Sequence, residues 1–243
     1  MKTAPLQPNA TVKRTHDEFY LTVDRRAQPK EYFKFVSDQL SICVGELGDA
    51  AVLDIGCATG EFLHYLKACY PSANLSGIDV VPSLLERARR VVPQAKFHEA
   101  DISSKSFVAP NQFDVVFMLG VHSIFDDLYW LDNAMSLVKP GGHFMCFGIF
   151  NPFDIDVFVK ARKKGSDTLE SGWNIVSQAT VLDHLRTIGF EGAFTPWKIS
   201  IPIPVTEADP FRSWTVLQAD GTYETRNGLQ LIHTFQLLHV GRS

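Results

Sequence analysis

The chain has 243 residues, 45% of them hydrophobic, which suits one sizeable domain or a domain with a cap. Its formal net charge of −4 excludes a global basic field that would attract nucleic acid, and no apolar run approaches the ~20 residues that a membrane helix needs. The four cysteines lack metal-ligand spacing and no trio of carboxylates stands out, so we expect reduced thiols and no metal. These features predict a cytoplasmic protein with neither nucleic-acid nor membrane partners.

The N-terminal part of the sequence predicts a tail followed by helices. Residues 1–14 are polar, contain no apolar core of a secretory signal, and are expected to form a loose tail. Apolar side chains then recur at helical spacing through residues 15–44, which predicts one or two helices. We therefore assign residues 1–45 to a tail and a helical cap. Phe19 and Tyr20 either cover a ligand as a lid or take part in ordinary helix packing.

From residue 46 onward, strand-like and helix-like segments alternate. The expected strands are residues 52–55, 75–80, 96–100, 114–119 and 143–150, and the expected helices are residues 60–70, 82–90 and 126–138. The continuous apolar run at 114–119 is typical of a strand buried on both faces. This alternation predicts an α/β domain in which helices cover both faces of a parallel sheet.

The pattern changes after residue 150. A basic helix is expected over residues 157–164, and a longer helix over 177–188 with a serine N-cap and a glycine after its last turn. Two β-like segments, 196–205 and 229–240, predict a final hairpin joined to the sheet. The connector between them, residues 206–228, is polar and rich in turn residues.

The stretch Val52–Phe62 combines a short apolar strand, a glycine-rich turn and the start of a helix. Gly56 and Gly60 permit positive φ and a close approach of the backbone to a ligand. The third small residue of the dinucleotide-binding pattern is misplaced in this stretch, and the carboxylates of Asp54 and Glu61 would repel a pyrophosphate. A ligand with an ammonium and a sulfonium is therefore favoured over NAD.

Further polar groups are expected at the carboxyl ends of the strands, where open parallel sheets bind their ligands. Asp79 ends the second strand and offers two acceptor oxygens to the vicinal hydroxyls of a ribose. Asp101 and Ile102 follow the third strand and together suit an adenine, which has a polar edge and a flat face. Leu119 and Gly120 end the fourth strand.

Five short motifs occur in order between residues 46 and 190. They are Val52–Gly60, Gly77–Asp79, Ala100–Ile102, Phe113–Val116 and Val138–Gly142. In this order and spacing they resemble the class I S-adenosylmethionine-dependent methyltransferases. The resemblance implies a Rossmann-like seven-stranded sheet, with strand seven antiparallel between strands five and six. It also implies S-adenosyl-L-methionine as the cofactor and S-adenosyl-L-homocysteine as the product.

The resemblance further implies a role for each strand end. Asp54 and the glycine loop would hold the methionine part of the cofactor, Asp79 the ribose, and Asp101 with Ile102 the adenine. The full set of cofactor-binding residues that we expect is Tyr20, Asp54, Gly56, Cys57, Ala58, Gly60, Asp79, Val80, Asp101, Ile102, Leu119 and Gly120. Ala58 replaces the middle glycine of the family's loop, where alanine is tolerated.

His122, just past the fourth strand, is the candidate general base for a nucleophile that carries a proton. The alternative is a loop histidine that packs locally or touches the cofactor. Asp126 and Asp127 are alternative bases or substrate ligands, although acidic residues at this position more often cap a helix.

The resemblance also implies that the acceptor pocket forms from residues 15–35 and from insertions near 151–176 and 206–228. Aromatic side chains are plentiful in or beside these insertions: Phe150, Phe153, Trp173, Phe211, Trp214 and Tyr223. Basic residues that either bind an anionic acceptor or form a solvated face are Lys160, Arg162, Lys163 and Lys164, with Arg25 and Arg26 elsewhere.

Residues 46–243 are thus expected to form a domain that methylates an O, N or C nucleophile of a small molecule. Acceptors of this kind include secondary metabolites and sugar- or nucleotide-linked glycan precursors. The family motif for exocyclic or amide nitrogens is absent from the fourth strand, which weakens DNA adenine and glutamine side chains as substrates. The alternatives are an RNA or protein methyltransferase, an NAD(P)-dependent oxidoreductase, and a catalytically silent cofactor-binding protein.

Overall fold

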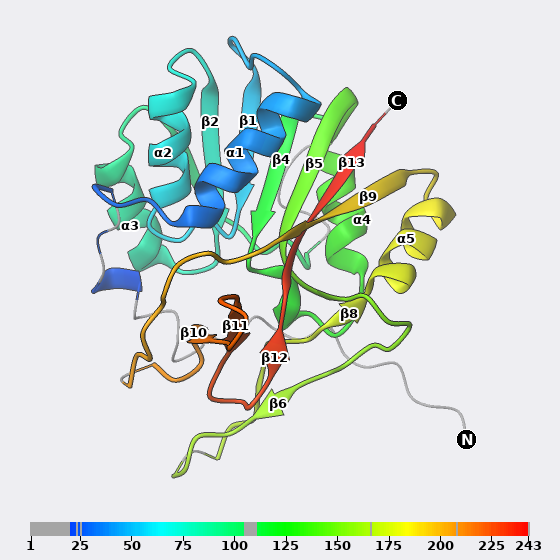
Figure 1. Ribbon diagram of the computed structural model, residues 1–243. Helices are drawn as coiled ribbons and strands as arrows, with labels where there is room; N and C mark the ends of the chain where they lie inside the picture. Colours follow the sequence, from blue (N-terminus) through cyan, green and yellow to red (C-terminus); the bar gives the residue numbers. More distant parts are fainter. Residues whose placement is uncertain are drawn as a thin grey trace.

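The computed structural model describes residues 20–22, 24, 26–104, 111–165, 167–207 and 209–242. Its centre is a twisted sheet with the strand order β3-β2-β1-β4-β5-β13-β9 (Figure 1). These strands are β1 Ala51–Ile55, β2 Asn74–Asp79, β3 Lys96–Glu99, β4 Phe113–Leu119, β5 Val138–Asn151, β9 Glu191–Trp197 and β13 Phe235–Gly241. A two-residue strand, β8 (Val176–Ser177), pairs with the end of β5.

The direction of each strand agrees with the predicted topology. β1 runs parallel to β2 and β4, and β4 runs parallel to β5. β13 lies between β5 and β9 and is antiparallel to both, with Leu237 opposite Phe147 on one side and Thr195 on the other. The prediction of a seven-stranded sheet with an antiparallel last strand is therefore confirmed.

Helices cover both faces of this sheet (Figure 1). One face carries α1 (Glu31–Cys43), α2 (Glu61–Cys69) and α3 (Pro82–Val91), and the other carries α4 (Tyr129–Leu137) and α5 (Gln178–Thr187). The side chains of β4 alternate between the two cores, which explains why its sequence is apolar without a break. No helix of the described ranges is long and apolar enough to cross a membrane.

The helical ends follow local sequence signals. The Ser177 hydroxyl accepts a hydrogen bond from the Ala179 N–H at 3.1 Å, as expected of an N-cap. Gly189 follows α5 with a φ of 85°, a conformation that glycine adopts without strain. Both caps were predicted.

The N-terminal helix is shorter than predicted. Residues 15–19, 23 and 25 lie outside the described residues. Within the described part of the expected 15–44, residues 20–21 form a 3₁₀ turn, residues 26–30 are not helical, and α1 is the α-helix. Pro29 gives a physical reason, because proline disfavours helical geometry in the residue before it. Lys30 follows this proline and is the extended N-cap residue of α1, with a φ of −61° and a ψ of 141°.

The prediction of a basic helix over residues 157–164 is wrong. The segment is extended, and β6 (Lys160–Ala161) pairs with β7 (Glu170–Ser171) in an arm that projects from the domain (Figure 1). Val157 also forms a bridge with Ile175. Pairing within the arm outweighs the helical spacing of charges, which the β-branched side chains at 157 and 159 already weaken.

The predicted final hairpin is correct in topology and wrong in the bounds of both strands, since β13 begins at Phe235 and not at residue 229. β9 occupies residues 191–197, whereas most of the expected strand at 196–205 lies outside the sheet. Pro202 and Pro204 have no backbone N–H with which to extend a sheet. The chain instead forms a small sheet from β10 (Trp214–Leu217), β11 (Tyr223–Arg226) and β12 (Ile232–His233). This small sheet lies near the carboxyl ends of the parallel strands (Figure 1).

Candidate functional site

The loop after β1 is bent back onto β2. Gly56, Ala58 and Gly60 all have positive φ, at 72°, 46° and 76°. The N–H groups of Gly56 and Cys57 both donate to the Ile78 carbonyl, at 2.8 and 3.0 Å. Ala58 adopts this conformation despite its Cβ, which costs about 1–2 kcal/mol in an L-residue. The loop is therefore held in one shape by its neighbour strand, and α2 starts directly after it.

Asp54 and Asp79 form a buried pair of carboxylates beside this loop. Burial raises the pKa of Asp54 well above its ordinary value, the charge of Asp79 raises it further, and Lys30 lowers it. The Oδ2 and Oδ1 atoms of Asp79 accept hydrogen bonds from the N–H groups of Ala58 and Val81, each at 2.9 Å. A carboxylate oxygen can accept more than one hydrogen bond, so hydroxyl groups of a ligand can still bind there. A site with two carboxylates that are this little exposed to solvent favours a positively charged ligand.

The residues after β3 lie next to Asp79, because the Ala100 N–H donates to the Asp79 carbonyl at 3.1 Å. The Asp101 carboxylate accepts hydrogen bonds from the N–H and the hydroxyl of Ser103, at 2.8 and 2.7 Å. The Ile102 side chain is buried in the core that includes α4. Val80, Asp101 and Ile102 are thus near the expected ribose and adenine positions, and their ligand contacts stay predictions.

The loop after β4 packs directly against the loop after β1. Gly120 has a φ of 77°, and its N–H donates to the Phe147 carbonyl at 2.7 Å. A Cβ added to Gly56 would overlap the Cγ2 atom of Val121. Gly56 thus permits a close approach, here between two loops of the protein. Leu119 is half-buried against the core below.

His122 opens a short 3₁₀ helix (His122–Ile124) and is 3% exposed. Its Nε2 lies 3.0 Å from the Ile149 carbonyl oxygen, and its ring stacks on Phe150 with centroids 4.3 Å apart. A Cβ added to Gly148 would overlap the His122 ring, so glycine makes room for the imidazole. Burial lowers the pKa of His122 to about 4. The ring is therefore neutral near pH 7.

A cavity of about 110 Å³ lies beside His122. Its walls come from the ends of β4 and β5, from β13, from the β6–β7 arm, and from one residue each of the N-terminal segment and the 206–228 connector. The lining residues are Tyr20, Gly120, His122, Ser123, Gly148, Ile149, Ala161, Glu170, Ser171, Gly172, Trp173, Phe211 and Phe235. Water in the liquid occupies about 30 Å³ per molecule, so this cavity holds a small chemical group.

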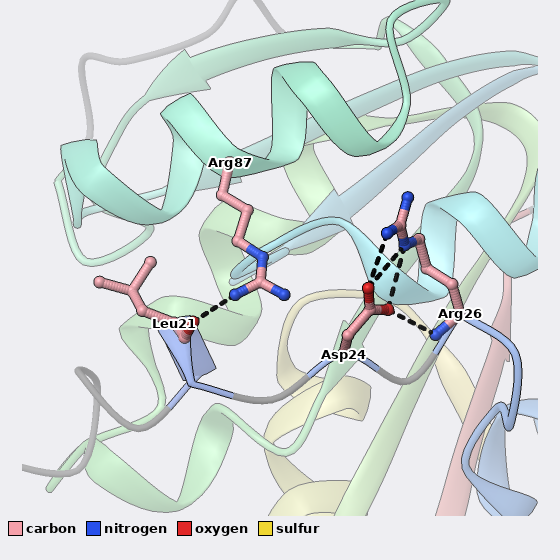
Figure 2. Close-up of polar contacts among 4 residues, drawn as sticks. All are labelled: Leu21, Asp24, Arg26 and Arg87. Carbon is pink, nitrogen blue, oxygen red and sulfur yellow. Dashed lines mark hydrogen bonds and ion pairs between the residues drawn. The ribbon is translucent and has the colours of Figure 1, made fainter.

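Tyr20 forms part of this wall, and the segment that carries it is attached to the domain (Figure 2). Lys30 and Arg212 lie over the Tyr20 ring, at 5.5 and 5.2 Å from its centroid. Arg87 of α3 donates to the Leu21 carbonyl, as Figure 2 shows. Tyr20 therefore lies where a lid is expected, whereas Phe19 lies outside the described residues.

The segment that follows Tyr20 also contains an ion pair. Figure 2 shows Arg26 and Asp24 facing each other, with the Arg26 Nη2 2.6 Å from the Asp24 Oδ2. The guanidinium lowers the pKa of Asp24 well below its ordinary value. Arg26 is thus engaged with a carboxylate of the same segment.

A hydrogen-bond network joins the β6–β7 arm to the loop after β4. Asn174 is fully buried, and its amide accepts from the Val159 N–H at 2.8 Å and donates to the Phe125 carbonyl at 2.8 Å. Asp126 accepts hydrogen bonds from Asn174 and Ser171, each at 2.9 Å. Asp126 thus holds the arm, whereas Asp127, which precedes the N-cap residue Leu128, accepts a hydrogen bond from the Tyr129 N–H at 3.0 Å at the start of α4.

The basic residues predicted to bind an anion are not gathered in this cavity. Lys160 forms an ion pair with Asp126 at 2.5 Å, and Lys163 lies over the Phe211 ring, 5.3 Å from its centroid. Arg162 and Lys164 are exposed. Arg25 lies outside the described residues.

The predicted aromatic residues divide into two groups. Trp173 and Phe211 line the cavity and Phe150 supports His122, as expected of an acceptor pocket. By contrast, Phe153 is 71% exposed. The other two, Trp214 and Tyr223, are half-buried in the small sheet.

Several residues of the described site were not singled out from the sequence, among them Lys30, Gly148, Glu170 and Phe235. A glycine inside an apolar strand often marks the close approach of another group, so Gly148 carried a signal that was not used. Lys30, Glu170 and Phe235 become neighbours of the site only through the tertiary fold.

Comparisons with known proteins agree with this geometry. The sequence profile described as "Methyltransferase domain" matches residues 52–142. A trans-aconitate 2-methyltransferase from Methylobacterium nodulans is 30% identical over 139 residues, which covers 52% of this chain and 50% of that protein. The chain therefore spans about half the length of this curated relative.

Solved structures share the fold at low sequence identity. The YcgJ protein from Bacillus subtilis has a TM-score of 0.59 and 12% identity, over 88% of this chain and 99% of its own. The S-adenosylmethionine-bound CalS10 is an amino pentose methyltransferase from Micromonospora echinaspora. It has a TM-score of 0.56 and 15% identity, and the match covers 97% of this chain and 99% of CalS10. These similarities establish the fold.

Proposed function

We propose, starting from the class I S-adenosylmethionine-dependent methyltransferase domain that this chain carries, that it transfers a methyl group from S-adenosylmethionine to a small-molecule acceptor. The observation that supports this proposal best is the buried carboxylate pair, Asp54 and Asp79, beside a loop with three positive φ values. Such a site stabilises a cationic ligand and disfavours a pyrophosphate. This same contrast argues against an NAD(P)-dependent oxidoreductase.

In this proposal each strand end binds a different part of the methyl donor. Asp54 and the loop from Gly56 to Gly60 hold the methionine part, and Asp79 accepts hydrogen bonds from the ribose hydroxyls. Asp101 and Ile102 lie at the expected adenine position. The sulfonium of the bound donor supplies an already activated methyl group, so the protein has to align the acceptor with it.

The acceptor side lies next to the donor side. Val121 packs against Gly56, and the neighbouring residues Gly120 and His122 line the cavity. We assign the acceptor to this cavity, with the N-terminal part through residue 45 as a cap and the segments 151–176 and 206–228 as the outer walls. An acceptor in this cavity would lie close to the donor, as methyl transfer requires.

An anionic acceptor is the second candidate, because two curated relatives that match this chain are named trans-aconitate 2-methyltransferases. Against it, the basic residues near 160–164 are paired, stacked or exposed, as described above. An RNA acceptor is disfavoured by the net charge of −4.

Calorimetric titration tests the proposed donor. We expect S-adenosylhomocysteine to bind with a single site per chain and NAD to give no heat. In Asp54→Asn, which removes the buried charge at nearly constant volume, the affinity for S-adenosylhomocysteine should fall at least tenfold. Binding of NAD with the higher affinity would contradict the proposal and favour the oxidoreductase.

A further inference from the structure

Trp173 is held in an unfavourable backbone conformation beside the cavity. Its φ is 66°, in the left-handed region that bulky L-residues rarely adopt and that glycine occupies without strain. Hydrogen bonds on both sides fix this turn. The Gly172 N–H donates to the Val159 carbonyl at 3.4 Å, and the Asn174 N–H donates to the Ser123 carbonyl at 2.8 Å. The turn therefore imposes the left-handed φ on whichever residue stands at position 173.

Full burial does not compensate for the strain at Trp173. The residue is half-buried and lines the cavity. Its indole lies against His233, with centroids 5.3 Å apart, and the His233 ring in turn packs on Phe235, another residue of the wall. A position that served only the turn would suit glycine or asparagine. Strained residues of other types cluster where a ligand is bound, so the indole has the character of a ligand contact.

Three further rings line the same cavity, each from a different segment. Tyr20 comes from the N-terminal segment, Phe211 from the 206–228 connector, and Phe235 from β13. All three are half-buried, so part of each side chain stays accessible. Phe235 is fixed by stacking on Phe147, with centroids 5.5 Å apart. Aromatic surface is therefore the property that these segments share at the cavity.

The size of the cavity fits one six-membered ring. A Cβ added to Gly120 would meet no atom within 4 Å, so this lining residue borders open space. The cavity volume is about 110 Å³, and a cavity of roughly 150 Å³ in another protein holds benzene. A single ring can occupy this space while its substituents extend out of the cavity.

Charges of both signs surround the cavity. Glu170 lines it, and three cations lie over two of its rings: Lys30, Arg212 and Lys163. Two of these cations also act on carboxylates, because Arg212 pairs with Asp209 at 3.1 Å and Lys30 lowers the pKa of Asp54. The charges thus favour neither a carboxylate nor an ammonium clearly.

Contact with the rings then decides between acceptors. Aromatic pairs in edge or offset geometry bind each other about 2- to 10-fold more tightly than their buried area alone gives. A saturated ring of similar size gains the burial and lacks this additional attraction. An aryl group is therefore the ligand that the walls of this cavity favour.

We propose that the methyl acceptor is an aryl compound whose ring is bound in this cavity against Trp173. This inference rests on the proposed methyl transfer and specifies its substrate class. Trp173 is then a specificity-determining residue that binds the ring. For a phenol, the transfer forms a bond between the phenol oxygen and the methyl carbon, breaks the methyl–sulfur bond with its electron pair left on sulfur, and releases the phenol proton to water.

The first experiment measures binding by ligand-detected NMR titration with S-adenosylhomocysteine present. The probes are pairs that differ in the ring and not in the functional group: benzyl alcohol with cyclohexylmethanol, and benzylamine with cyclohexylmethylamine. We expect the aryl member of each pair to bind at least fivefold more tightly to the wild type. Equal affinities within the pairs would overturn the inference.

The second experiment compares the wild type with Trp173→Gly and Trp173→Phe, using labelled S-adenosylmethionine and a series of substituted phenols and anilines. Trans-aconitate is the acceptor without a ring. Glycine removes the indole and relieves the strain at this φ, so the variant should fold. Phenylalanine keeps an aromatic ring. Tyr129→Leu, at an aromatic residue of α4 that is 60% exposed, is the control.

We expect product from aryl compounds. In Trp173→Gly, the KM for these acceptors should rise at least tenfold while kcat changes less than threefold, because the ring binds and does not react. Trp173→Phe should restore the KM to within about threefold of the wild type. Tyr129→Leu should behave as the wild type, and the affinity for S-adenosylhomocysteine should stay within about twofold in all variants.

Three results would overturn the inference while leaving the donor site in place. They are an unchanged KM in Trp173→Gly, a higher kcat/KM for trans-aconitate than for every aryl compound, and no product from any phenol or aniline. Failure of S-adenosylhomocysteine to bind to the wild type would instead overturn the proposed function itself.

Discussion

The two sides of the candidate site are built on different principles. The donor side consists of short loops that continue directly from β1, β2 and β3, and each is held by hydrogen bonds to the neighbouring strand. The acceptor side combines the loop after β4 with a projecting arm, the small β10–β12 sheet and the N-terminal segment. The first is fixed by the sheet, whereas the second depends on contacts between segments far apart in the sequence. Changes on the two sides should therefore act on different properties.

Substitution of Gly56 should have the largest effect on stability. Gly56→Ala places a Cβ at a φ of 72° and against the Val121 side chain, so strain adds to steric overlap. We expect a loss of about 3 kcal/mol in the free energy of unfolding, measured with urea. The control is Gly221→Ala, with a φ of 82° and open space around its Cβ, which should cost about 1 kcal/mol. Equal losses in the two variants would contradict the tight packing of the two loops.

Acidification should lower the stability of the folded protein through the buried histidines of the acceptor side. Burial lowers the pKa values of His122 and His233 from 6.5 to about 4 in the folded protein. As the pH falls below 6.5, the unfolded chain takes up protons that the folded chain does not, so stability falls until about pH 4. Each histidine should account for a loss of about 2 kcal/mol between pH 6.5 and pH 5.

Urea unfolding at several pH values measures this effect. Over the same interval, His122→Gln should lose about 2 kcal/mol less than the wild type. An unchanged dependence on pH would contradict the burial of a neutral ring at this position.

Removal of the Asn174 side chain should destabilise the acceptor side and leave the donor side unchanged. Asn174→Ala breaks the hydrogen bonds to Val159, Phe125 and Asp126 and leaves buried polar groups unsatisfied, so we expect a loss of about 2 kcal/mol. Hydrogen exchange should become faster in the β6–β7 arm and stay unchanged in β1 and α2. Asn151→Ala, which affects a local turn, is the control. Faster exchange throughout the sheet would show that the sides are not independent.

The sequence predicted the donor side closely and the acceptor side only in outline. Asp54, Asp79 and the glycine loop follow strands whose apolar patterns are clear, and parallel strands bring their carboxyl ends to one edge. Residues 157–164 were predicted as a basic helix, whereas the structure pairs β6 within this segment with β7. That pairing depends on Asn174 and Asp126, which contact it across a separation that no local pattern reveals.

His122 shows the limit of prediction from sequence most clearly. Its place after β4 was predicted, but the properties that matter come from Ile149, Phe150 and Gly148 on the neighbouring strand. The burial of the ring and its contact with the Ile149 carbonyl are both consequences of how the loop after β4 packs on β5.

The proposed donor site is tested most directly by the affinity of S-adenosylhomocysteine for Asp79→Ala, measured by calorimetry. Loss of the two hydrogen bonds to a ribose should weaken binding at least 30-fold, about 2 kcal/mol, while the fold persists in circular dichroism. Asp49→Ala, at an exposed carboxylate before the amino end of β1, should bind as the wild type. Equal affinity in Asp79→Ala and wild type would contradict the placement of the donor at the carboxyl ends of the strands.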